Sequence, residues 1–142
     1  MGWLDHWRQN SEVSQPDLLT GEITPVPSKD GRYTGVTANK RLKDELKARG
    51  AEKQTYREVN TIVTQGMLGC SPRELDEATG YDSDRSKLPA DAQEALTVGD
   101  IAARRRIEDN DAQGPSQLKQ SASEGISEVR GLFSWNRKGK GR

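Results

Sequence analysis

The chemistry that this sequence offers most clearly is phosphate binding at its C-terminal end. Basic side chains neutralise phosphates, and the indole of Trp135 could stack on an unpaired base. No acidic residue follows Glu128 to compete for these cations. An equally weighted alternative is a solubilising terminus whose aromatic residues, Phe133 and Trp135, pack onto the helices. The predicted nucleic-acid-binding residues are Arg130, Trp135, Arg137, Lys138, Lys140 and Arg142.

Residue types that commonly perform catalysis are scarce. His6 is the only histidine, and it lies near a chain end where no rigid element is predicted to hold it for acid–base chemistry. Cys70 precedes a predicted helix N-terminus, a position that can lower a thiol pKa, but with no histidine near it in the sequence a buried cysteine is favoured. One cysteine and one histidine cannot form the usual zinc site. We therefore predict no enzyme, no metal and no cofactor.

A second basic cluster, residues 104–106, invites the same nucleic-acid interpretation. Successive residues of a helix turn by about 100°, so three consecutive arginines do not form one patch. Arg104 and Arg105 also have Glu108 and Asp109 one turn further along the chain. A solvated, ion-paired helix face is the favoured interpretation.

Two apolar features predict contacts with a protein partner. A stripe of small residues on one helical face would let another helix approach closely. Near the N-terminus, two tryptophans and a leucine form a small apolar face if that segment is helical, and tryptophans at a polar terminus favour docking on a partner. The predicted interface residues are Trp3, Leu4, Trp7, Ala92, Ala95, Gly99, Ala102 and Ala103.

Five segments have helical periodicity and recognisable ends. Ser71 is the N-cap of the best-marked helix, with Pro72 at its first position, Glu74 closing a capping box, and Gly80 ending it. Gly and Pro residues bound the others in the same way. The predicted helices cover about residues 39–49, 56–68, 72–79, 89–110 and 116–133.

The amino-acid composition limits the size of the core that these helices can form. Of 142 residues, 24 are Leu, Ile, Val or Phe, below the roughly 20% that flags disorder, while the net charge is zero. We expect a small core that a partner helps to bury. The predicted fold is all-α: a small bundle of about five helices over residues 38–134, an extended Pro/Gly-containing arm over 1–37, and a basic flexible tail over 135–142.

Several motifs of the helical part resemble those of a known group of proteins. Over about residues 54–130 the chain resembles the C-terminal helical region of the DNA-damage-inducible protein D group and of related phage antirepressor-like proteins. The resemblance implies a regulatory or accessory binder connected with phage biology and DNA damage, and it identifies no site residues. The segments that carry it are YREVN at 56–60, GMLG at 66–69, SPREL at 71–75, LPADA at 88–92 and DAQG at 111–114.

These observations together predict a non-enzymatic, phage- or plasmid-linked accessory protein that binds nucleic acid or a DNA-repair or regulatory complex. The alternative is a structural or assembly protein, acting as a homo-oligomer or as a small subunit of a larger particle through its terminal arms. We expect a protein partner or homo-oligomer, with nucleic acid a possible target and no small-molecule substrate. No apolar run reaches the roughly 18 residues of a membrane span, and a single cysteine predicts a reducing cytoplasm.

Overall fold

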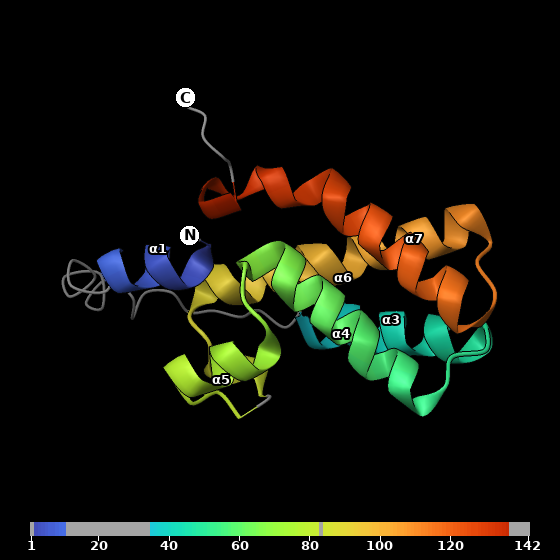
Figure 1. Cartoon of the computed structure of the whole chain (residues 1–142), viewed down its shortest axis with the longest axis horizontal. Coiled ribbons are helices and arrows are strands. Elements are labelled where there is room, and N and C mark those ends of the chain that lie inside the picture. The colour runs from blue at the N-terminus through green and yellow to red at the C-terminus, as the bar shows by residue number, and fades with distance from the viewer. Residues whose placement is uncertain (1, 11–34, 83, 137–142) are drawn as a thin grey trace.

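The computed structural model describes residues 2–10, 35–82 and 84–136, and these are helical with no strand among them (Figure 1). The predicted all-α bundle, with five α-helices after residue 34, is confirmed. None of the described helices is long and apolar enough to cross a membrane. The α-helices are α1 (Trp3–Asn10), α3 (Gly35–Ala48), α4 (Lys53–Leu68), α5 (Pro72–Thr79), α6 (Ala90–Asn110) and α7 (Gly114–Val129), and the 3-10 turns are η1 (Arg85–Lys87), η2 (Arg130–Leu132) and η3 (Ser134–Asn136).

Local signals place the ends of the middle helices as predicted. The Ser71 side chain accepts a hydrogen bond from the Glu74 amide at 3.1 Å, and the Glu74 carboxylate accepts one from the Ser71 amide at 2.9 Å. This reciprocal pair satisfies two amides that the first turn of α5 leaves without helical partners. Gly69 and Gly80 end α4 and α5 in the left-handed conformation, which a residue without a Cβ adopts without strain.

The core forms where α6 lies against α3, α4 and α7 (Figure 1). The small-residue stripe of α6 was predicted as a face for a protein partner, but Ala92, Ala95, Gly99 and Ala103 are buried against helices of the same chain. Ala102 is partly buried, and a Cβ added to Gly125 of α7 would lie 2.5 Å from its carbonyl oxygen. The stripe therefore serves close packing of helices within the chain.

The N-terminal arm differs from its prediction in its first residues. Trp3–Asn10 is a helix, where an extended segment was predicted, and α3 begins at Gly35. Tertiary packing accounts for this difference, because Trp3 is fully buried and stacks on Trp7 one turn later with ring centroids 5.4 Å apart. The rest of the predicted arm, residues 11–34, lies outside the described residues.

Candidate functional site

The C-terminal residues predicted to bind nucleic acid are engaged with the chain itself where the structure describes them. Trp135 is half-buried, and its indole N–H donates to the Met67 carbonyl at 2.7 Å. Arg130 donates from Nε to the Gly66 carbonyl at 3.1 Å. These contacts correspond to the alternative interpretation, in which the aromatic end packs onto the helices. The other predicted residues, Arg137, Lys138, Lys140 and Arg142, lie outside the described residues.

The N-terminal residues predicted to contact a partner also pack on their own chain. Trp3 is fully buried and its indole N–H donates to Asp91 Oδ1 at 3.0 Å. His6 Nε2 lies 3.3 Å from Asp91 Oδ2, and its ring lies 4.9 Å from that of Trp135. Leu4 and Trp7 are partly buried against the core. Both described ends of the chain therefore close the same end of the bundle.

Cys70 and the arginine cluster behave as the sequence interpretation favoured. Cys70 is buried, and desolvation, aided by the nearby charge of Glu74, raises its pKa to about 11. The thiol is therefore protonated at neutral pH and is a poor nucleophile. Arg104 pairs with Glu108 at 2.9 Å along α6, and Arg106 reaches across to carboxylates of α7 at 3.1 and 3.2 Å.

A pocket of about 730 Å³ lies where α3, α4, η1 and α6 meet. This volume falls within the range of about 300–1,000 Å³ typical of ligand sites. Apolar side chains of α3 and α4 form part of its wall, among them Leu42, Leu46 and Val59. Tyr56 adds an aromatic ring that is partly exposed, and Val36, 78% exposed, lies at the start of α3 on the same surface.

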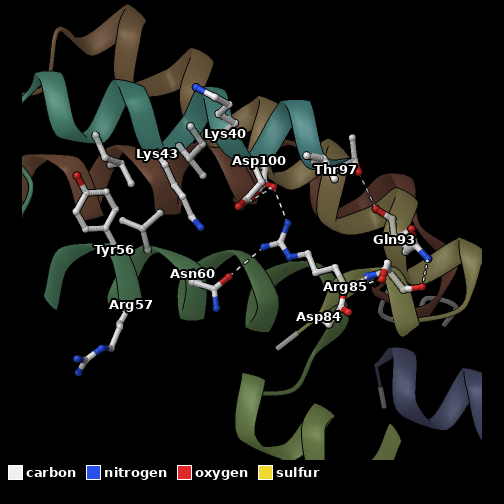
Figure 2. A pocket seen from close by; sticks show the side chains of 16 residues that line it. Lys40, Lys43, Tyr56, Arg57, Asn60, Asp84, Arg85, Gln93, Thr97 and Asp100 are labelled. Carbon is white, nitrogen blue, oxygen red and sulfur yellow. Dashed lines mark hydrogen bonds and ion pairs between the residues drawn. The ribbon is translucent and has the colours of Figure 1, made fainter. Parts of the chain in front are cut away.

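Basic side chains from three segments line this pocket (Figure 2). Lys40 and Lys43 come from α3, Arg57 from α4, and Arg85 from η1. Lys40 forms an exposed ion pair with Asp44 at 3.0 Å. Asp84 and Asp100 also line the pocket, so its formal charge is +2 when both are ionised.

The two acidic residues have different environments. Asp84 is exposed and caps η1, and its hydrogen bonds with Ser86 lower its pKa. Asp100 is fully buried and forms an ion pair at 2.6 Å with Arg85. Burial raises the pKa of Asp100, and the opposing effects of Arg85 and of a hydrogen bond from Asn39 are smaller.

Asp100 and Arg85 form the centre of a polar network at the pocket wall (Figure 2). Arg85 donates from Nη1 to Asp100 Oδ2 at 2.6 Å and from Nη2 to Asn60 Oδ1 at 3.0 Å. Asn39 donates to the same Asp100 oxygen at 3.3 Å. The other oxygen, Oδ1, is buried and accepts no hydrogen bond from any described residue. The network fixes the guanidinium and leaves one strong acceptor unsatisfied.

The sequence interpretation missed this pocket because its residues come from four separated segments. One signal was present: Asp100 occupies a position on the apolar stripe of α6, four residues after Leu96 and three before Ala103. A carboxylate on a buried helix face requires a partner, and that requirement pointed to a basic residue elsewhere in the chain.

The groups around the pocket are suited to binding a ligand. Within the described ranges, no group of three or more His, Cys, Asp or Glu side chains is placed to hold a metal ion. Cations, amides and an aromatic ring around a pocket can recognise an anionic, partly planar ligand. Comparison with models of known protein families and with curated proteins finds no match to this chain, so the resemblance described above remains a prediction.

Proposed function

We propose that this protein is a non-enzymatic accessory protein that binds nucleic acid, and that the pocket between α3, α4, η1 and α6 contacts the strand. The observation that carries the proposal is that Lys43 and Arg85 point into a single pocket that the Tyr56 ring also lines, with Lys40 and Arg57 at its edge (Figure 2). The resemblance to DNA-damage-inducible and phage antirepressor-like proteins supports the same class of partner.

The chemistry of the pocket favours nucleic acid over a simple anion. Lys43 and Arg57 are exposed, so phosphates of a strand can reach them from solvent. Tyr56 offers a ring on which a base can stack, a contact worth about 1–3 kcal/mol per base. Single-stranded regions present such unstacked bases, so we expect preference for a single strand over a duplex.

The assembly alternative has less support than it had from the sequence alone. It relied on aromatic residues at the two ends of the chain to clasp neighbouring subunits. Trp3 and Trp135 instead donate their indole hydrogen bonds to Asp91 and to the Met67 carbonyl of the same chain. The pocket, in contrast, brings cations, an aromatic ring and amide groups to one surface of the described residues.

The proposal is tested by measuring the affinity of the full chain for a fluorescently labelled single strand over a range of salt concentrations. The double variant Lys43→Ala/Arg57→Ala removes two exposed cations from the pocket. If each contacts one phosphate, the slope of log K against log salt should flatten by about 1.4, because each single-strand contact contributes about 0.7.

The matched control is Arg73→Ala/Arg105→Ala, which removes two exposed arginines outside the pocket. This control should retain the salt slope of the unmodified protein. A protein that binds no strand at low salt would refute the proposed function. Equal loss in both double variants would instead show that the pocket is not the contact surface.

A further inference from the structure

We propose that the pocket takes one unstacked base of a nucleic-acid strand, and that Asp100 Oδ1 accepts a hydrogen bond from an exocyclic amino group of that base. The inference rests on the proposed function, and it adds which chemical feature of the strand is recognised. Its evidence is the unsatisfied oxygen of Asp100, whereas phosphate binding is argued from the exposed cations.

The unsatisfied oxygen of Asp100 is the observation from which the inference starts. Oδ2 receives hydrogen bonds from Arg85 and Asn39, whereas Oδ1 receives none from the described residues although Asp100 is fully buried. Buried acceptors almost always have a donor, because leaving one without a partner is costly. A donor from outside this network would therefore complete the site.

Because Asp100 lines the pocket, a hydrogen-bond donor for its Oδ1 would come from a group bound in the pocket. Figure 2 shows its carboxylate at the pocket wall, near the bound guanidinium of Arg85 and the side chain of Lys43. Arg85 and Asn39 both donate to Oδ2, and Arg85 is itself held by Asn60, so the orientation of the carboxylate is fixed. Oδ1 is buried, so binding includes rotation of neighbouring side chains, as is common at interfaces.

Because Arg85 forms an ion pair with Asp100 at 2.6 Å, the carboxylate acts as an acceptor, and this determines which bases it can bind. It has acceptors and no donor, so it pairs with the amino groups of cytosine, adenine or guanine. Uracil and thymine present a carbonyl oxygen where cytosine has its amino group, and two acceptors repel each other. Tyr56, at the other end of the pocket, can stack on a neighbouring base, while Lys43 between the two contacts a phosphate (Figure 2). A strand of cytosines should therefore bind more tightly than a strand of uracils.

The first experiment compares oligo(dC) with oligo(dU) of equal length, at one salt concentration and neutral pH, on the full chain. The expected preference for oligo(dC) is about 5- to 150-fold, the range of discrimination given by a specific side-chain contact with a base. A strand of N4,N4-dimethylcytosine, which has no amino hydrogen, should lose this preference. Equal affinity for all three strands would overturn the inference while leaving the proposed function intact.

The second experiment uses Asp100→Asn. Its amide oxygen can still accept from Arg85, which turns the amide N–H groups towards the pocket, so the preference should invert in favour of oligo(dU). Asp109→Asn, the same change at an exposed position of α6, should keep the preference for oligo(dC). An unchanged preference in folded Asp100→Asn would refute the inference.

Two further outcomes are decided by the same measurements. If Asp100→Asn does not fold, as judged by circular dichroism, the dimethylcytosine comparison on the unmodified chain decides the inference. If the unmodified chain binds none of the strands at low salt, the proposed function fails and the base contact fails with it.

Discussion

The close contact between α6 and α7 can be tested by adding a single methyl group at Gly125. A Cβ built on Gly125 would lie 2.5 Å from the carbonyl oxygen of Ala102 and 2.9 Å from its carbonyl carbon. Neither atom can rotate away, because both belong to the backbone of the neighbouring helix. We therefore expect Gly125→Ala to force α7 away from α6 and to destabilise the protein.

Two opposing terms determine the size of this effect. Replacing glycine by alanine inside a helix favours folding by about 1 kcal/mol. Overpacking a well-packed core costs about 1–3 kcal/mol, and the rigid backbone at Gly125 places this site at or above the upper end of that range. The net expected loss is about 2 kcal/mol or more, which lowers Tm by at least about 4–8 °C for a chain of this size.

The assay is thermal and urea unfolding followed by circular dichroism, with two matched substitutions. Gly131→Ala should be close to neutral, because nothing lies within 4 Å of its added Cβ. Gly99→Ala should cost less than Gly125→Ala, because its nearest obstacle is the flexible Met67 side chain at 2.6 Å. If Gly125→Ala melts at or above the temperature of the unmodified protein, the close approach of these helices is refuted.

Three other perturbations test separate parts of the structure. Ser71→Ala should lower the free energy of unfolding by about 0.5–2 kcal/mol in urea titrations, because it removes the Ser71 hydroxyl that accepts a hydrogen bond from the Glu74 amide. A neutral result would contradict the cap. Alkylation of Cys70 at pH 8, followed by mass spectrometry, should be at least about 100-fold slower in the folded chain than in urea. A thiol pKa of about 11 in the folded chain, compared with 9.0 for an exposed cysteine, leaves about a hundredth of the reactive thiolate. Equal rates in the two states would show that the thiol is exposed. Deleting residues 137–142 tests the predicted tail: a flattened salt slope for a single strand would assign phosphate contacts to it, and an unchanged slope would remove it from the interface.

Local sequence signals predicted the helices because each signal and its effect lie within a few residues. Ser71 and Glu74 satisfy each other's backbone amides across a single turn, so the start of α5 required no knowledge of the rest of the fold. Gly69 and Gly80 end their helices through their own backbone freedom. Such effects survive in any tertiary arrangement, which makes them visible in a sequence.

The parts that the sequence interpretation missed depend on residues far apart in the chain. Trp3 is fully buried, and its indole N–H donates to Asp91, 88 residues later in the chain. The ion pair between Arg85 and Asp100 lies at the pocket wall, and the amide oxygen that also binds Arg85 comes from Asn60 on another helix. Periodicity identifies which face of a helix is buried, but it does not identify the element that covers that face.

The contact between α1 and η3 has a consequence for the order in which the fold forms. His6 lies against Trp135, and Trp135 with Asn136 donates to the Met67 carbonyl at the end of α4. Helices α3 to α7 can pair with one another without α1, but the aromatic surface beside His6 exists only once η3 is seated on α4. The docking of α1 is thus coupled to the ordering of a segment more than a hundred residues later in the chain.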